Sequence, residues 1–328
     1  MKILLLTTFD VKQDMILENC KNQYQMFTYF IYNKFKLSNL DVILHNIGPT
    51  GFSGRVKKFY QKWTCPQADH CLIIDNRGVI KRPQMFLDKI REKVLGCVST
   101  ISASNGIVGN EDILFYLIPS GKRRKFKCRY IGWACDDQLC YSNQNKDNIR
   151  ILIDHVYYGQ GRIKNSDKTL EISKQAVEYF KNNDKVAIRR LCNGGVETVD
   201  ENNYNTIGKY NQNKGMSFEK ACEEYSLSDV YFVTHQECMG LVVLECAMSG
   251  ALIVTPKNYI KYELIKSLHH LIYENNEIPW DEIIKTIDHN KSRQKAQRFS
   301  WTNSCNTMMD TFVNWESYRS KLVFRNIH

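Results

Sequence analysis

The sequence lacks the long apolar runs that mark membrane-spanning and secreted precursor proteins. No stretch of its 328 residues approaches the ~20 consecutive apolar residues that cross a bilayer. The first apolar run, Ile3 to Leu6, ends at Thr7, Thr8 and Asp10, so it is too short for a signal peptide and suits a first strand. We therefore expect a soluble chain that works in the cytoplasm or, at most, at a membrane surface.

Paired cysteines are also lacking. The twelve cysteines are scattered, and no CxxC pair occurs. We interpret the trio Cys128, Cys135 and Cys140, like His70 beside Cys71, as core or surface thiols rather than as a zinc site. A reduced, intracellular environment is favoured, and no metal is expected.

Acidic residues are fewer than basic ones, which leaves a formal charge of +10. The densest basic cluster is the segment KRRKFKCR, which begins with Lys122, Arg123, Arg124 and Lys125. We interpret it as a surface loop. Peripheral contact with anionic lipid and binding of nucleic acid are the two alternatives, and nucleic acid is the less expected partner.

The chain is too long for one ordinary α/β core, so two domains are expected. In the first 148 residues strand and helix patterns alternate, as in a Rossmann-like domain. A glycine-rich segment, GPTGFSG, follows the second strand but has neither P-loop nor GxGxxG spacing, which indicates a flexible connection. The third strand ends in Asp75 and Asn76, where a ligand would lie. The strands are expected at 2–8, 41–47, 68–76, 97–101 and 112–118, and the helices at 24–37 and 83–95.

The second half repeats this α/β order after a polar connection. Arg162, Lys164 and Lys168 gather between a strand end and the start of a helix, which suits either a phosphate or an ordinary basic surface loop. Strands are expected at 149–158, 186–191, 204–210, 230–233 and 252–254, and helices at 170–180, 216–225, 241–248, 259–271, 279–287 and 300–313.

The most informative stretch is DVYFVTHQECMGLVVLECAMSGALIVTP, residues 229–256. It reads as a strand, a polar loop, an apolar helix and a second strand, which is the βαβ unit of a parallel sheet. Glu237 lies in the loop and Glu245 in the helix. Because ligands of open α/β sheets bind beyond the carboxyl ends of strands, Glu237 stands at the expected ligand position.

This stretch and its surroundings resemble the retaining GT-B glycosyltransferases, in particular family 4. The resemblance rests on the spacing ECMGLVVLE, the small-residue turn CAMSG, the strand ALIVTP, the preceding basic loop and the late segment RFSWTNSCNTMMDTF. The resemblance covers residues 149–313 and extends to the first half only through its β/α order. It implies two Rossmann-like domains that face a central cleft, with a C-terminal helix that crosses back to the first. The expected limits are 1–148 for the acceptor side, 149–310 for the donor side and 311–328 for the returning helix.

What the resemblance implies for the site can be assigned residue by residue. Glu237 would contact the donor sugar and Glu245 the ribose hydroxyls, while Arg162 and Lys168 would stabilise the leaving group in place of a metal. The remaining donor contacts would be the backbone amides of Met239, Gly240 and Leu241 for the diphosphate and the strand ends at Gly194 and Lys209 for the base.

The first half departs from the family pattern. The family often has a Gly-Gly loop after its first strand and a His after a middle strand, where this chain has Thr8 to Asp10 and Ser102 to Ser104. Asp75 is the substitute expected on the acceptor side.

We therefore predict a metal-independent retaining glycosyltransferase that moves a hexose or another sugar from a UDP- or GDP-sugar donor to a glycan, lipid or protein-linked hydroxyl acceptor. A GT-B glucosyltransferase acting on nucleic acid bases and a degenerate nucleotide-sugar binding module are the alternatives.

Overall fold

The chain forms two compact α/β units. The computed structural model describes residues 1–7, 14, 16–17, 20, 23–46, 64–74, 83–102, 112–116, 128–131, 134–137, 148–154, 157–159, 162–164, 166–192, 195–206, 218–235, 241–259, 263–274 and 276–324. Unit 1 comprises Met1–Trp133 with Trp301–His328, and unit 2 comprises Ala134–Ser300. Cys135 belongs with unit 2 because it bridges to Ser300. The sequence pattern alone places these divisions at 148 and 310.

Unit 1 is built on a six-stranded sheet in which every neighbouring pair is parallel, in the order β2-β1-β3-β4-β5-β6. Ile3 to Leu6, in an inner strand of this sheet, are completely buried, as expected for a strand covered on both faces. The strands are β1 (Lys2–Thr7), β2 (Asp41–Asn46), β3 (His70–Ile74), β4 (Val98–Ser102), β5 (Ile113–Tyr116) and β6 (Cys128–Tyr130), and helices α1 (Gln23–Leu37) and α3 (Pro83–Arg91) connect them.

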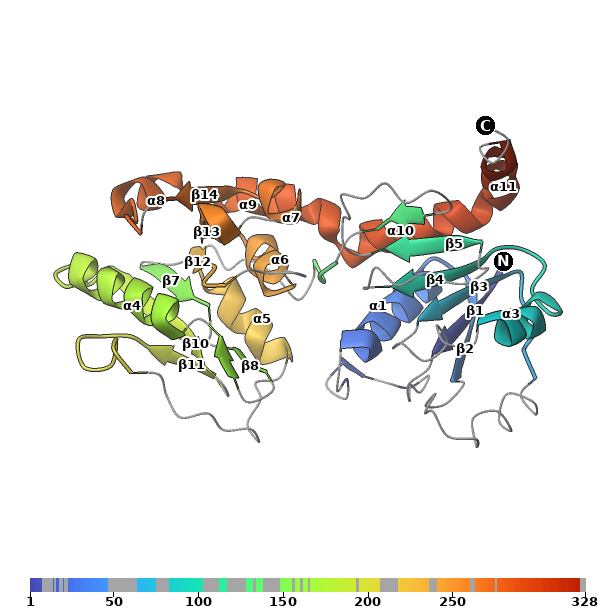
Figure 1. Cartoon of the computed structure of the whole chain (residues 1–328), viewed down its shortest axis with the longest axis horizontal. Coiled ribbons are helices and arrows are strands. Elements are labelled where there is room, and N and C mark those ends of the chain that lie inside the picture. The colour runs from blue at the N-terminus through green and yellow to red at the C-terminus, as the bar shows by residue number, and fades with distance from the viewer. Residues whose placement is uncertain are drawn as a thin grey trace. The chain divides into compact units, whose positions relative to one another are not determined.

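The last two helices, α10 (Trp301–Val313) and α11 (Trp315–Phe324), belong to unit 1 (Figure 1). The Trp301 ring stacks on Phe30 at 5.6 Å between ring centroids and also contacts Phe27, and both phenylalanines lie on α1. Phe312 stacks on His70 of β3, with 5.2 Å between the centroids. The predicted return of a C-terminal helix to the first unit is confirmed.

Unit 2 has a second six-stranded sheet, in the order β11-β10-β7-β12-β13-β14. Its pairs are parallel except that β11 runs antiparallel to β10. The strands are β7 (Ile149–Ile153), β10 (Val186–Cys192), β11 (Gly195–Thr198), β12 (Val230–Phe232), β13 (Leu252–Pro256) and β14 (His270–Tyr273). The strands β8 (Tyr157–Gly159) and β9 (Arg162–Lys164) form a separate antiparallel pair.

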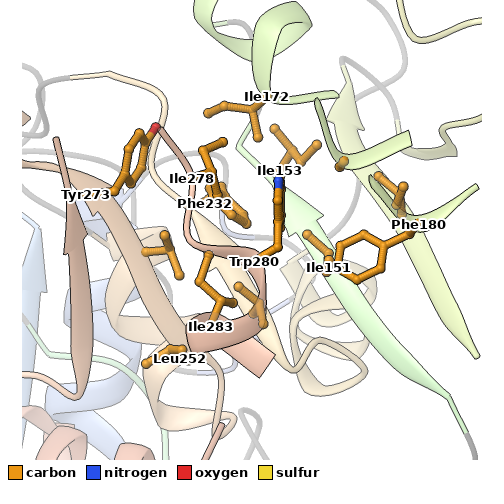
Figure 2. Packing of buried hydrophobic residues seen from close by; sticks show 14 of the residues in the cluster. Ile151, Ile153, Ile172, Phe180, Phe232, Leu252, Tyr273, Ile278, Trp280 and Ile283 are labelled. Carbon is orange, nitrogen blue, oxygen red and sulfur yellow. The ribbon is translucent and has the colours of Figure 1, made fainter. Parts of the chain in front are cut away.

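Helices pack on both faces of this sheet. Figure 2 shows the core on one face, where Ile151, Ile153 and Phe232 of the strands meet Phe180 of α4 and Trp280 of α8. The alternate strand residues are also buried and point to the opposite face, which α6 covers. The helices are α4 (Ser166–Phe180), α5 (Phe218–Ser226), α6 (Leu241–Met248), α7 (Glu263–Lys266), α8 (Trp280–Thr286) and α9 (His289–Ala296).

Two of the predicted elements of unit 2 differ from the structure. The expected strand 204–210 begins in a turn, where the carbonyls of Asn203, Tyr204 and Thr206 accept hydrogen bonds from the buried Arg190 guanidinium, and its residues 207–210 lie outside the described residues. The strand β10 pairs with β7 on one side and with β11 on the other. The expected helix 259–271 contains only the short α7, and its end enters β14, which pairs with β13.

Helices α9 and α11 were not anticipated, and α4 begins at Ser166, before the predicted start. Within the described segments no helix has both the length and the apolar character of a membrane span.

Candidate functional site

The order of the strands in unit 2 contains a point where the chain reverses direction across the sheet. From β7 the chain crosses to β10 on one side, and it later returns to β12 on the other side of β7. In open parallel sheets, ligands bind beyond the carboxyl ends of the two strands that flank such a switch point. The residues that follow β7 and β12 are therefore the first candidates for a site.

The residue that follows β7 is Asp154, and the residues that follow β12 include His235. The Nδ1 atom of His235 lies 2.9 Å from Oδ2 of Asp154, and the Asp154 side chain is only 2% exposed. The backbone N–H of Asp154 donates to the carbonyl of Phe232 at 3.0 Å, which fixes the carboxylate beside β12. Sequence reasoning missed this pair, because the strand predicted at 149–158 runs through Asp154, whereas β7 ends at Ile153.

Glu245 is the most unusual carboxylate near this edge. It lies on α6, the helix that follows β12, and is 7% exposed. The structure shows no hydrogen bond or ion pair of its carboxylate with any described residue. Burial raises the pKa of Glu245 from its ordinary 4.5 to about 8.

Two neighbours of Glu245 are affected by the same burial. The pKa of the Tyr225 hydroxyl is raised well above its usual value, first by burial and then by the charge of Glu245. The pKa of the Cys246 thiol is raised for the same two reasons in the same order. Both groups are therefore neutral, and neither supplies a positive partner for the Glu245 carboxylate.

Lys168 lies in the first turn of α4, inside the helix rather than before it. Its ammonium donates to Asn276 Oδ1 at 2.6 Å and to Glu171 Oε2 at 3.1 Å. It also lies 5.7 Å from the centroid of the Tyr273 ring. Burial, with the nearby Glu171 charge, raises the pKa of the Tyr273 hydroxyl, so Lys168 stands among neutral and acidic groups.

The other predicted donor residues are only partly described. The backbone of Arg162 begins β9, and Leu241 is the first residue of α6. Glu237, Met239, Gly240, Gly194 and Lys209 lie outside the described residues. On the first unit, the basic cluster at Lys122 to Lys125 and the acceptor candidate Asp75 also lie outside them.

Unit 1 has a switch point of its own, between β1 and β3. The chain crosses from β1 to β2 on one side and returns to β3 on the other. Thr7 and Ile74 are paired at the carboxyl ends of these strands. Asp75 follows Ile74 directly in the sequence.

No group of three or more His, Cys, Asp or Glu side chains suited to a metal ion occurs among the residues that the structure describes.

Solved structures with the same arrangement of two parallel sheets align with nearly the whole chain. AviGT4, a glycosyltransferase involved in avilamycin A biosynthesis, has a TM-score of 0.55 at 12% identity, over 95% of this chain and 97% of its own. The chain has the GT-B fold.

Two further structures extend the comparison. The lipopolysaccharide outer core galactosyltransferase WaaB has a TM-score of 0.51 at 10% identity, over 96% of this chain and 100% of its own. A UDP-N-acetylglucosamine 2-epimerase has a TM-score of 0.53 at 9% identity, over 97% of each chain. No family model and no curated protein sequence matches the chain. The predicted fold is thus confirmed, and it is a fold that serves both sugar transfer and sugar epimerisation in these proteins.

Proposed function

We propose that the protein is a retaining glycosyltransferase that moves a hexose from a UDP- or GDP-sugar to a hydroxyl of a glycan, lipid or protein-linked acceptor. The observation that supports this most is Glu245. A buried carboxyl group without a described partner is costly to ionise, and the two adjacent hydroxyls of a ribose are donors that would stabilise its carboxylate form. Its helix follows one of the two switch-point strands.

The other donor contacts follow from the chemistry of a nucleotide sugar. Glu237 would hold the sugar, and the amides of Met239, Gly240 and Leu241 at the start of α6 would bind the diphosphate. Arg162 and Lys168 would carry the positive charge that stabilises the leaving nucleotide, without a metal. The base would lie near Gly194 and Lys209, and Asp75 is the candidate for the acceptor side.

Lys168 already has two polar partners, Glu171 and Asn276. An ammonium has three N–H donors, so a phosphate oxygen can be bound in addition to these partners or in exchange for Glu171. Contacts of this kind hold the ammonium in place before the donor arrives, which lowers the entropy cost of binding.

The proposed reaction retains the anomeric configuration. The bond between C1 of the sugar and the diphosphate oxygen breaks, and the acceptor oxygen bonds to C1 on the same face. The acceptor proton passes to the departing diphosphate oxygen, so the step requires no separate protein base.

Proton NMR of the protein incubated with UDP- and GDP-sugars and a set of hydroxyl acceptors tests the proposal. Release of the nucleoside diphosphate together with a product of unchanged anomeric configuration is the expected result. A change in the sugar while it stays attached to the nucleotide would indicate an epimerase instead. Binding without any turnover would indicate a nucleotide-sugar binding module.

Glu237→Ala and Arg162→Ala should each lower the transfer rate at least about 100-fold, because each removes a charged contact that is strongest in the transition state. Glu178→Ala, on the exposed side of α4, is the matched control and should keep full activity. If either site variant retained full donor consumption, its assigned role would be wrong.

The two remaining partner classes are tested separately. A base-modifying enzyme should shift duplex DNA in a gel and lose that binding steeply with added salt, and absence of a shift removes this alternative. Sedimentation with anionic vesicles tests whether Lys122, Arg123, Arg124 and Lys125 contact a membrane surface.

A further inference from the structure

We infer that His235 is a further donor-binding residue that contacts the diphosphate, and that Asp154 is the residue that positions it. This inference deepens the proposed function and rests on it. Neither residue belongs to the set predicted from the sequence.

The placement of the pair in the fold is the first argument. Val230 to Phe232 of β12 lie in parallel register with Ile151 to Ile153 of β7, so both strands end at the same edge of the sheet. Asp154 follows one strand and His235 follows the other, and the two strands flank the switch point of unit 2. The pair therefore straddles the position at which a ligand binds in open α/β sheets.

The rigidity of the pair is the second argument. The N–H of Asp154 is bonded to the carbonyl of Phe232, and the N–H of Val233 is bonded to the carbonyl of Val254 at 2.9 Å. These bonds hold the backbone on both sides of the pair. Oδ2 of Asp154 lies 2.9 Å from Nδ1 of His235, so the Nε2 edge of the ring faces away from the carboxylate.

Exposure decides which member meets a ligand. The Asp154 side chain is 2% exposed and the His235 side chain is 16% exposed. A ligand at this edge can thus reach the ring, while the carboxylate stays behind it. A buried carboxylate at hydrogen-bond distance favours the positively charged imidazolium, which donates from Nε2 and attracts an anion.

The diphosphate is the part of the donor that matches a cation here. His235 opens the loop that leads to α6, whose first residue is Leu241, and the N-terminus of a helix attracts anions through its free amides.

Unit 2 offers a matched control, since it contains a second histidine–aspartate pair at the other edge of the same sheet. His289 Nε2 lies 3.2 Å from Asp229 Oδ1. Asp229 precedes β12 and also accepts the backbone N–H of Arg150. The His289 ring contacts the aspartate through Nε2, and its Nδ1 lies 3.0 Å from the carbonyl oxygen of Gly250. The strands begin at this edge, so no donor is expected there.

The test compares binding of UDP and GDP with binding of uridine and guanosine, measured on the full-length protein by calorimetry and ligand-observed NMR. His235→Gln should weaken binding of the preferred nucleoside diphosphate about 10- to 100-fold, the usual value of a hydrogen bond to a charged group, and leave the nucleoside within about twofold. His289→Gln should leave both unchanged. Thermal unfolding of each variant shows whether it is folded, and His235→Asn replaces His235→Gln if the latter is not.

Asp154→Asn tests positioning. It should weaken diphosphate binding in the wild-type background and add no further loss to His235→Gln, whereas a purely structural role would give additive losses. Unchanged diphosphate binding by His235→Gln, or equal loss of nucleoside and diphosphate, would overturn the inference. If the wild-type protein bound no nucleotide at all, the proposed function itself would fail, and this outcome is distinct from the other two.

Discussion

At the scale of single residues, the buried carboxyl group of Glu245 makes the stability of the protein depend on pH. An unfolded chain holds this carboxyl at its ordinary pKa of 4.5, whereas the folded protein holds it at about 8. At a pH between these two pKa values, the Glu245 carboxyl is protonated in the folded state and ionised in the unfolded state. Stability is therefore lost as the pH rises from about 4.5 to about 8.

Glu245→Gln should remove this loss. The neutral amide is expected to stabilise the protein relative to wild type by roughly 2–4 kcal/mol at pH 8 and by less than about 1 kcal/mol at pH 5. Urea unfolding at the two pH values measures the difference, with Glu178→Gln on the solvent side of α4 as the control. A gain that did not depend on pH would contradict the assignment of the shift to Glu245.

The residue scale also shows where the sequence is informative about the site and where it is not. Glu245 could be placed on a helix because the length and apolar content of the segment Leu241 to Met248 suit a packed helix. The Asp154–His235 pair could not be found this way, because its two members come from strands that are neighbours in space but distant in sequence. Only the order of the strands brings them together.

At the scale of elements, buried parallel strands were the easiest to predict. The strand β1 was located almost to the residue, because a short β-branched or aliphatic run between polar breaks has few other interpretations. The bounds of the helix α6 were also predicted correctly. The strand β14 was read as the end of a helix. Its residues, HLIY, are compatible with either state, and pairing with β13 decides between them.

The turn that enters β4 gives a prediction at this scale. An added Cβ on Gly96 would lie 2.5 Å from Nδ1 of His70 and 2.6 Å from the carbonyl oxygen of Asp69. The same His70 nitrogen accepts the N–H of Cys97 at 2.9 Å, and the Asp69 carbonyl accepts the N–H of Gly96 at 2.8 Å. Neither atom can move without losing a hydrogen bond.

Gly96→Ala is therefore expected to destabilise unit 1 by about 2–4 kcal/mol, as overpacking against fixed atoms does. The adjacent Leu95 is 85% exposed, so Leu95→Ala is the matched control and should change stability by less than about 0.5 kcal/mol. Thermal unfolding of the two variants provides the measurement. Equal melting temperatures would show that the turn can open to admit a methyl group.

At the scale of the whole molecule, the fold is set by the pattern of elements rather than by particular side chains. The chain keeps the GT-B arrangement at 9–12% identity to the structures it matches. Each unit has its own parallel sheet with its own switch point, so the order of strands and helices positions a candidate site on each unit. Nearly all the residues to which we propose a role belong to the second unit, and the side chains of Asp154, Lys168, His235 and Glu245 are among those that the structure describes.

The two units differ in how the chain builds them, which leads to a prediction about fragments. Unit 2 is one continuous segment, 134–300, and its two ends are joined by the bridge between Cys135 and Ser300. Unit 1 needs residues from both ends of the chain, since Trp301, Met308 and Phe312 of α10 are at most 2% exposed. Burial of these three side chains is worth on the order of 5–9 kcal/mol, comparable with the whole stability of a domain.

A fragment of residues 134–300 should consequently fold alone, with dispersed amide NMR signals and cooperative urea unfolding. A fragment of residues 1–133 should not fold by itself and should gain cooperative unfolding when residues 301–328 are joined to it through a flexible linker. Trp301→Ala in this joined fragment is the specific control, because it removes the ring that packs against Phe27 and Phe30 and should cost about 3–5 kcal/mol. Cooperative folding of 1–133 without the C-terminal helices would show that α10 only covers a core that is already complete.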